Sequence, residues 1–352
     1  MISLGSLANY IISSALYYCQ GSPLLMLLFQ VTCVAIEFLY SILSKFNFWT
    51  SPKAGIDQYV LDYKKMNNTL AEERFAIVTG ANSGIGLETS KALALAGFHV
   101  IMACRNKKLA AEAISKLELE TGLKTFEFIQ LDLASFKSID VFIDQYKKSY
   151  SKLHLLVNNA GLAFCPYSKT KDGIEMQFGT NHLGHFKLTN GLLDLIKASG
   201  RARIVVVSSL ANYVGTFDKS LILEESRYNR IISYGISKLC NIMFANELAR
   251  RLNGTGIAVN SLHPGSVNTN ATKYLPDSLH GVIDVIKSLL LIGPIAGSLT
   301  SVKVALDPKL EGVTGKFFMN QEEATPLGEA LDEQKCKDLW EFSEELIKKH
   351  ST

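Results

Sequence analysis

Short apolar runs alternate with longer stretches of helical periodicity from residue 75 onward. The apolar runs occupy residues 75–79, 98–103, 125–131, 153–157, 203–207 and 256–261. Helical periodicity occupies residues 87–96, 109–121, 136–148 and 238–252. Strands that are apolar throughout are buried on both faces, so this alternation predicts an α/β fold with a parallel sheet between two layers of helices. Ligands of such sheets bind beyond the carboxyl ends of the strands, where we expect functional residues.

Residues 1–45 precede this pattern and are predicted to be a hydrophobic membrane anchor. Residues 24–44 are apolar over a length that rises ~30 Å as a helix, about the thickness of a hydrocarbon core. Glu37 counts against an anchor, because a carboxyl group is costly in lipid. A cleaved signal peptide and a buried helix of a soluble domain are the alternatives. A second apolar stretch at 7–19 is too short to span alone, and the sequence does not decide whether it enters the membrane.

Lysines follow the apolar run, whereas only the amino terminus precedes it. The positive-inside tendency then places the rest of the chain in the cytosol. The membranes expected are those of the endoplasmic reticulum and of the lipid droplet. Residues 46–73 are polar, contain Pro52 and Gly55 as breakers, and are expected to be a linker with one short helix. Residues 74–350 are expected to form one domain.

The charge balance and the cysteines exclude some classes of site. Lys and Arg total 36 against 33 Asp and Glu, for a net charge of +3, and no basic block is present, so nucleic acid is not an expected partner. The 6 cysteines are scattered without a CxxC pair and are interpreted as free thiols. His182 and His185 have the spacing of a metal pair, but no third ligand is evident, so no metal site is expected.

A glycine-rich turn follows the first predicted strand. It reads Gly80, Ala81, Asn82, Ser83, Gly84, Ile85, Gly86. Without a Cβ, Gly allows a tight turn and lets backbone N–H groups approach a pyrophosphate at a helix N-terminus. The spacing is GxxxGxG, not the GxGxxG of many dinucleotide folds. The turn therefore predicts a dinucleotide phosphate site, with a ligand-free glycine turn as the alternative.

The residue type after the second predicted strand bears on the choice of dinucleotide. An acidic residue there would bind the ribose hydroxyls of NAD, and none is present. Arg105 stands close by, and a cation at this place can accept a 2′-phosphate. We therefore expect NADP(H) as cofactor, with a solvent-facing arginine as the alternative.

The third and fourth predicted strands also end in polar residues. Asp132 is placed to accept from an adenine amino group, or equally to cap the helix that begins near Ser135. The fourth strand ends in a turn of small and polar residues that would let a cofactor lie close, namely Asn158, Asn159, Ala160 and Gly161.

Tyr234 and Lys238 are four residues apart at the start of a helical stretch, which places them on one helical face. A phenol has a pKa of ~10 in water, and an adjacent ammonium lowers that value. Such a tyrosine can donate a proton to a carbonyl or accept one in reverse. A Tyr–Lys pair at this spacing is by itself a common coincidence.

Two further groups could serve the same chemistry. Ser208 and Ser209 directly follow the fifth predicted strand, where a hydroxyl could hold a substrate oxygen or cap a turn. Asn181 is predicted to lie within a helix, where Asn is a poor former, and this suggests a polar role such as ordering a proton-relay water.

Together these residues resemble the short-chain dehydrogenase/reductase family. The resemblance covers residues 74–348 and rests on TGxxxGxG, NNAG, the helix Asn, the strand-end Ser and YxxxK in family order. It implies a single Rossmann-like, doubly wound parallel sheet with helices on both faces, here preceded by a membrane helix. It implies a catalytic tetrad of Asn181, Ser209, Tyr234 and Lys238, where Ser209 is chosen because the second Ser is the family's usual one. It also implies that the cofactor contacts Tyr234, Lys238, Pro264, Gly265 and Thr269.

Within the family, the sequence looks most like membrane-anchored retinol dehydrogenases and the dehydrogenase domain of the WW-domain-containing oxidoreductase. Residues 237–252, 310–312 and 338–347 carry that likeness. No WW module is evident, and the apolar N-terminus agrees better with the retinol dehydrogenase group.

This resemblance implies an NADP(H)-dependent carbonyl reductase or alcohol dehydrogenase with Tyr234 as general acid/base. The anchor favours a lipophilic substrate: retinal or retinol, a steroid, a fatty aldehyde or a polyprenal. The apolar stretch at 279–299 falls where the family's substrate lid lies, or packs as a core helix. A homodimer is compatible with the sequence. The alternatives are an NADPH-binding sensor or scaffold with little turnover, and a quinone or carbon–carbon double-bond reductase.

Overall fold

The computed structural model describes residues 51–67, 72–267 and 291–350, together with helical residues 8, 9, 11, 12, 15, 16, 25, 28–30, 32, 33, 35, 36 and 39. In this part of the chain, one 8-stranded sheet has the order β3-β2-β1-β4-β5-β6-β7-β8. All neighbouring strands are parallel except β7 and β8. The strands are β1 (Arg74–Thr79), β2 (Phe98–Cys104), β3 (Phe126–Gln130), β4 (Leu155–Asn158), β5 (Ala202–Val207), β6 (Ile257–His263), β7 (Phe317–Met319) and β8 (Glu322–Ala324).

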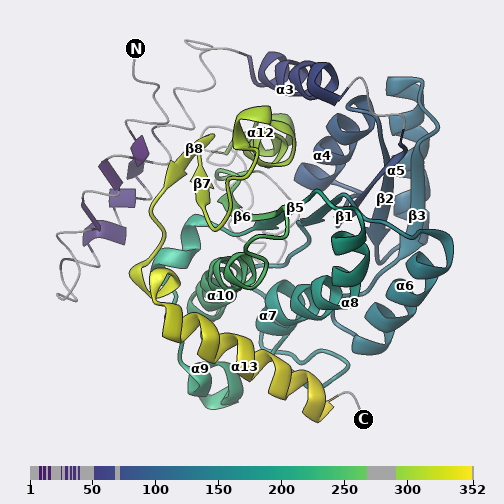
Figure 1. Ribbon diagram of the computed structural model, residues 1–352. Coiled ribbons are helices and arrows are strands. Elements are labelled where there is room, and N and C mark those ends of the chain that lie inside the picture. Colours follow the sequence, from purple (N-terminus) through teal and green to yellow (C-terminus); the bar gives the residue numbers. More distant parts are fainter. Residues whose placement is uncertain are drawn as a thin grey trace, which may run out of the picture.

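Helices cover both faces of this sheet (Figure 1). The α-helices are α3 (Pro52–Asn67), α4 (Gly84–Leu95), α5 (Lys107–Thr121), α6 (Phe136–Ser149), α7 (Met176–Phe178), α8 (Gly184–Ala198), α9 (Lys219–Leu223), α10 (Arg230–Arg251), α12 (Pro294–Leu306) and α13 (Glu333–His350). Short turns are the π-helix η1 (Gly179–Leu183) and the 3₁₀ helices η2 (Leu210–Val214), η3 (Glu225–Arg227), η6 (Pro308–Leu310) and η7 (Gly328–Leu331).

Two apolar cores separate the helices from the sheet. One core joins the sheet to α3, α4, α5 and α12, and the other joins it to α6, α8, α10 and α13. Every residue of β6 is buried, as are the last four residues of β1. This confirms the predicted parallel sheet between two helical layers, since all six predicted strands occur within two residues of their expected ends.

The strand register brings the functional turns to one edge. Thr79 at the end of β1 pairs with Ala103 of β2, and Val78 pairs with Val157 of β4. The chain runs outward in both directions from β1 and β4, which makes their junction the topological switch point of the sheet. The turns after β1, β2 and β4 therefore meet at the same carboxyl edge.

The short helix predicted within the linker is a helix of 16 residues in the structure. Helix α3 packs against α12 and α4, and it buries Ile56 and Tyr63 in the core beneath it. The polar composition of this segment hid the two apolar contacts. Residues 52–67 are therefore packed against the domain rather than extended away from it.

The hairpin of β7 and β8 was also not predicted. Asn320 and Gln321 connect the strands, and both have positive φ, at 53° and 66°. Two such residues form a tight turn of the type that matches strand twist, although the usual glycine is absent. Strands of three residues with this turn carry too little periodicity to be recognised from sequence.

Several described N-terminal residues pack against the domain. Ile12, Leu16, Phe29 and Cys33 are buried in the core on the α10 side. The ring of Phe29 meets Tyr213 edge-on at 5.2 Å between centroids. Among the described residues, no helix is both long and apolar enough to cross a membrane. Most of the predicted anchor lies outside the described residues, so the spanning helix stays a prediction.

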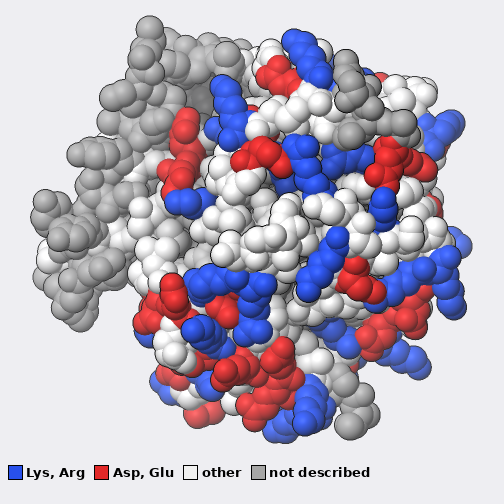
Figure 2. Space-filling model, in the orientation of Figure 1, with Lys and Arg blue, Asp and Glu red and all other residues white. Residues whose placement is uncertain are grey.

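Charged side chains of both signs are intermingled on the face shown in Figure 2. Red and blue patches alternate over the helices, with white surface between them. This distribution agrees with the near balance of charges in the whole chain, where the net charge is +3.

Candidate active site

Backbone conformation explains the glycines of the turn between β1 and α4. Gly80 and Gly84 have φ of +66° and +58°, a region that favours glycine. A Cβ on Gly86 would lie 2.5 Å from the carbonyl oxygen of Gly80 and 2.6 Å from Asn159 Nδ2. Ser83 is the N-cap of α4 but makes no side-chain capping bond. The first N–H groups of α4 therefore remain available to an anionic ligand.

Thr79 ties the glycine turn to the turn that follows β4. Its Oγ1 accepts hydrogen bonds from the backbone N–H groups of Asn159 and Ala160, both at 2.9 Å. Asn159 Nδ2 in turn donates to the Thr79 carbonyl oxygen at 2.8 Å. Sequence reasoning assigned no role to Thr79 or the Asn159 side chain, although the threonine precedes the first glycine of the motif.

Arg105 is exposed directly after β2. It makes no ion pair with any described residue, whereas the preceding Cys104 is buried under the glycine turn. Burial raises the pKa of the Cys104 thiol to about 11, against hydrogen bonds from the backbone of Asn82 and Ala81. Ile85 lies in the first turn of α4, on the same edge. The cation expected to meet a 2′-phosphate therefore stands beside the turn expected to hold the pyrophosphate.

Asp132 follows β3 at this edge and is engaged by two neighbours. Its Oδ1 accepts from the Ala134 N–H at 3.1 Å, and its Oδ2 pairs with Lys171 at 3.0 Å. The N-cap of α6 is Ser135, whose hydroxyl accepts from the Ser138 N–H. Helix capping, one of the two roles expected for Asp132, thus falls to Ser135.

The residues at the end of β4 and just after it contact different parts of the protein. Asn158 is buried, and its Nδ2 donates to Thr189 Oγ1 on α8 at 2.9 Å. Its side chain therefore packs toward α8 rather than toward the glycine turn. A Cβ on Gly161 would lie 3.3 Å from Asn181 Oδ1 and 3.4 Å from Lys238 Nζ, so this glycine gives the loop close access to both polar groups.

Tyr234 and Lys238 lie one turn apart near the start of α10. The Lys238 Nζ lies 5.8 Å from the centroid of the Tyr234 ring and donates to the Val207 carbonyl oxygen at 3.1 Å. Burial lowers the pKa of Lys238 to about 8. Burial also raises the pKa of Tyr234, and a hydrogen bond with Ser209 opposes that rise. The sequence predicted that Lys238 would lower the pKa of Tyr234, whereas in the structure burial raises that pKa.

The two serines after β5 face different partners. Ser208 is buried, and its hydroxyl donates to the Lys238 carbonyl oxygen at 2.6 Å. Ser209 is partly exposed and caps η2 by accepting from the Ala211 N–H at 3.2 Å, and its hydroxyl lowers the pKa of Tyr234 against the effect of burial. Of the two hydroxyls, that of Ser209 is the one beside the phenol.

Asn181 lies in the π-helix η1, where the regular helical hydrogen bonding is interrupted. Its side chain exchanges two hydrogen bonds with the Leu162 backbone, each at 2.9 Å, and donates to Ser237 Oγ at 2.9 Å. Ser237 Oγ donates to the Tyr234 carbonyl oxygen at 2.7 Å. Asn181 therefore joins the turn after β4 to the helix that carries Tyr234 and Lys238.

An aromatic residue that the sequence did not single out stands at the phenol. The Phe164 ring lies 5.0 Å from the Tyr234 ring, and Phe164 has a φ of 57°, which is uncommon outside glycine. Its backbone N–H donates to Gln177 Oε1 at 2.8 Å. Phe164 is distinguished by its positive φ, and a positive φ at a phenylalanine cannot be predicted from the sequence.

Pro264 and Gly265 follow β6 at the same edge, and Gly265 has a φ of 90°. Thr269, the residue expected to bind a carboxamide, lies outside the described residues, as does most of the expected lid at 279–299. Around Tyr234, the structure places Lys238 Nζ 5.8 Å from the ring centroid and connects Asn181 to the Tyr234 carbonyl oxygen through Ser237. The Ser209 hydroxyl lowers the Tyr234 pKa.

A family model described as short chain dehydrogenase matches residues 74–279. The chain belongs to this family. It is an oxidoreductase that acts on alcohol and carbonyl groups.

Two relatives illustrate the range of similar short-chain dehydrogenases. Retinol dehydrogenase 14 of Homo sapiens is 40% identical over 293 residues, which covers 79% of this chain and 87% of the relative. Short-chain dehydrogenase TIC 32 B, chloroplastic, of Brassica napus is 40% identical over 287 residues, covering 79% and 89%. The likeness to retinol dehydrogenases noted in the sequence is thereby confirmed.

Solved structures share the short-chain dehydrogenase fold. An uncharacterized protein from Mycobacterium Paratuberculosis superposes with a TM-score of 0.62 at 33% identity, covering 78% of this chain and 93% of that one. A short chain dehydrogenase from Shigella flexneri 2A, complexed with NADP, superposes with a TM-score of 0.56 at 23% identity, covering 72% and 99%. The Rossmann-like doubly wound sheet is therefore shared, and at 23% identity nothing beyond the fold follows.

Proposed function

We propose that this short-chain dehydrogenase is an NADP(H)-dependent carbonyl reductase or alcohol dehydrogenase for a lipophilic substrate, with Tyr234 as general acid/base. The observation that carries the proposal is the meeting of three groups at the carboxyl edge. The Ser209 hydroxyl lowers the pKa of Tyr234, and Lys238 Nζ lies 5.8 Å from the centroid of the phenol ring. Such a group can move one proton to or from an oxygen held beside it.

The residues at this edge fit a nicotinamide dinucleotide. A Cβ on Gly86 or Gly161 would crowd polar neighbours, so glycine lets the turns after β1 and β4 pack closely at this edge. The uncapped start of α4 offers N–H donors to a pyrophosphate. When bound, the nicotinamide supplies or accepts the hydride.

The protein's own groups would handle the proton. Ser209 would hold the substrate oxygen, and Tyr234 would donate its proton to that oxygen in reduction or accept it in oxidation. Burial raises the pKa of Tyr234, which keeps the phenol protonated and suits the reducing direction. Below a pH of about 8 Lys238 remains charged and would stabilise the phenolate left after donation. Asn181 would fix the loop and helix relative to each other through Leu162 and Ser237.

The preference for NADP(H) is proposed from Arg105. This side chain is exposed beside the glycine turn, and no described carboxylate neutralises it. A free cation there suits a 2′-phosphate, whereas NAD-binding sites usually carry an acid. The structure neighbours that hold NADP have the same fold.

A lipophilic substrate is proposed from the surroundings of Tyr234 and from the relatives. The Phe164 ring gives the phenol an apolar wall. Tyr167, in the same loop as Phe164, packs against Tyr228 before α10 at 5.2 Å between centroids. Retinal or retinol, a steroid, a fatty aldehyde and a polyprenal all fit such a wall. Several relatives are named retinol dehydrogenases.

We further propose that the N-terminal segment attaches the enzyme to the membrane of the endoplasmic reticulum or of a lipid droplet. The catalytic domain would face the cytosol. Phe29 and Cys33 face the domain and are buried. Leu25, Leu28 and Leu39 are exposed at 42%, 55% and 56%, on a neighbouring stripe at helical spacing. An apolar stripe exposed beside a docked stripe is suited to contact with lipid. Protease protection in sealed microsomes tests the orientation, since a domain resistant until detergent is added would contradict it.

The test of the activity is NADPH oxidation by detergent-solubilised protein with retinal, decanal, a 17-ketosteroid and a polyprenal. Tyr234→Phe should abolish turnover and leave NADPH affinity nearly unchanged, because it removes the proton donor but no phosphate contact. Tyr59→Phe, which removes a hydroxyl on α3 remote from α10, is the matched control and should behave as wild type. Wild-type turnover in Tyr234→Phe would contradict the proposal. NADPH binding without turnover on any substrate would favour a sensor or scaffold.

A further inference from the structure

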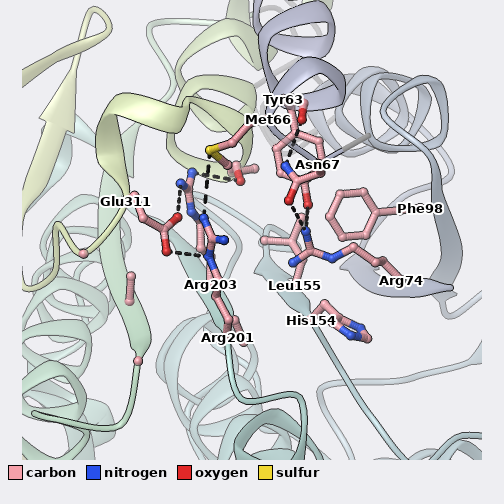
Figure 3. Close-up of a pocket in the computed structure, with 15 residues that line it drawn as sticks. Tyr63, Met66, Asn67, Arg74, Phe98, His154, Leu155, Arg201, Arg203 and Glu311 are labelled. Atoms are coloured by element: carbon pink, nitrogen blue, oxygen red, sulfur yellow. Dashed lines mark hydrogen bonds and ion pairs between the residues drawn. The ribbon is translucent and has the colours of Figure 1, made fainter. Parts of the chain in front are cut away.

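A second pocket lies at the opposite edge of the sheet from the candidate active site. It is lined by residues at the amino ends of three strands: Arg74 begins β1, His154 precedes β4, and Arg201 and Arg203 flank the start of β5. Its interior volume is about 20 Å³, room for about one water molecule, and its mouth is open to solvent. Figure 3 shows Arg74 on one side of this pocket, and Arg201, Arg203 and Glu311 on the other.

Positive charge exceeds negative charge in this amino-edge pocket. Three guanidinium groups line it, and Glu311 is the one carboxylate among its described lining residues. Glu311 is shared, since its Oε1 pairs with Arg201 at 2.6 Å and its Oε2 with Arg203 at 3.2 Å. Arg203 also donates to the carbonyl oxygens that end α12, which gives it a structural role. The lining therefore carries a formal excess of two positive charges.

Arg74 is the cation without an acidic partner in the described part of the chain. Its Nη1 donates to the Tyr63 hydroxyl and to Asn67 Oδ1, which are both neutral. The preceding acids are engaged elsewhere, because Glu72 pairs with Lys152 and Glu73 faces His99. The Arg74 hydrogen bonds that the structure shows use Nη1, so Nε and Nη2 are left to other acceptors. Burial lowers the pKa of Arg74, which reflects a charge partly withdrawn from water.

His154 is a second, independent indication that a hydrogen-bond acceptor is missing beside Arg74 in the described structure. The residue is 4% exposed, and its Nδ1 accepts from the Phe75 N–H at 3.2 Å, which leaves the ring proton on Nε2. That buried Nε2 has no hydrogen-bond partner among the described residues. Buried donors are normally paired, so an unpaired one beside Arg74 calls for an acceptor. Burial lowers the pKa of His154 to about 4, so near neutral pH the ring is a neutral donor.

We propose that the amino-edge pocket binds a phosphate group, held chiefly by Arg74. A guanidinium presents parallel N–H donors that match two oxygens of a phosphate or carboxylate. The excess of two charges suits a dianionic phosphate better than a singly charged carboxylate. Arg201 is about half exposed at the mouth, where it can turn toward a bound anion. The phosphate belongs either to a small molecule or to a lipid headgroup, since both present the same oxygens.

The first test is thermal unfolding of the full-length protein in detergent, saturated with NADPH, as inorganic phosphate replaces chloride at constant ionic strength. We expect phosphate to raise the Tm by several degrees and acetate to raise it less. Arg74→Gln should lose the phosphate effect. Lys197→Gln, which removes an exposed charge on α8, and Arg105→Gln, which alters the carboxyl edge, should both keep it. Arg201→Gln should weaken it and serves as the test if Arg74→Gln does not fold.

The second test is flotation with vesicles of phosphatidylcholine alone or mixed with phosphatidic acid. A preference for phosphatidic acid that Arg74→Gln loses, without a Tm response to free phosphate, assigns the site to a lipid headgroup. A Tm response that Arg74→Gln loses assigns it to a free phosphate compound. The proposal is overturned if Arg74→Gln and wild type respond equally in both tests, or if wild type responds in neither.

Discussion

The imidazole of His185 lies 2.9 Å from the hydroxyl of Thr79, measured from Nε2 to Oγ1. Because Thr79 Oγ1 already accepts two backbone N–H bonds, its own proton points to His185 Nε2. The ring proton is then on Nδ1, which lies 2.9 Å from the Asn181 carbonyl oxygen. His185 thus connects the glycine turn to Asn181, the residue that joins the loop after β4 to α10.

We predict that His185→Phe lowers kcat more than it raises KM for substrate. The ring volume stays, but both hydrogen bonds are lost, so the turn and Asn181 shift relative to each other. A misplacement on this scale costs up to about 10²-fold in rate. Steady-state kinetics measures the split. Thr79→Val should reproduce the loss and Thr79→Ser should largely avoid it; equal activity of the valine and serine variants would contradict the coupling.

Substituting the two serines after β5 should have different effects, one on activity and the other on stability. Ser209→Ala removes the hydroxyl beside Tyr234 and should lower kcat/KM by on the order of 10²-fold or more, with little change in stability. Ser208→Ala leaves the Lys238 carbonyl oxygen without its buried donor and should cost about 1–3 kcal/mol of unfolding free energy. Kinetics and urea unfolding of both variants check this. The assignment of Ser209 fails if Ser208→Ala is the variant with the larger loss of turnover per folded molecule.

Arg105→Asp should reverse the cofactor preference toward NAD. The substitution replaces a cation expected at the 2′-phosphate by an acid that can accept from ribose hydroxyls. The ratio of kcat/KM for NADPH and NADH is the measurement. Lys197→Asp changes charge equally at an exposed position on α8 and should leave the ratio unchanged. An unchanged ratio in Arg105→Asp would remove the ground for the NADP(H) proposal.

Buried histidines should make the protein less stable in mild acid. Burial lowers the pKa of His182 to about 3, whereas an unfolded histidine titrates at about 6.5. Below about pH 6.5 the unfolded chain binds a proton at this histidine, whereas the native state does not. The free energy of unfolding therefore falls as the pH falls. His182→Gln, which can still reach Ser343, should lose about 2 kcal/mol less than wild type between about pH 7.5 and pH 5. Urea unfolding at several pH values gives the slope, and identical slopes would contradict the assigned pKa.

Local pattern sufficed for the elements that lie in the middle of the sheet. Each of β1 to β6 is an apolar run bounded by turn residues, so period and composition identify it without knowledge of its neighbours. The glycine turn could be recognised too, because Gly80 and Gly84 require positive φ and Gly86 requires space. The packing of helix α3 and the β7–β8 hairpin could not be recognised, since they depend on contacts with α12 and β6.

The sequence by itself determined the alternation of strands and helices, the glycine turn and the spacing of Tyr234 and Lys238, because each is encoded within a few consecutive residues. The family resemblance favoured Ser209 over Ser208, but only the tertiary structure showed that Ser208 is engaged by the Lys238 carbonyl oxygen and that His185 reaches Thr79. The same holds for the amino-edge pocket, whose lining residues are far apart in the chain. Strand register and helix packing bring such residues together, and neither can be predicted from a few consecutive residues.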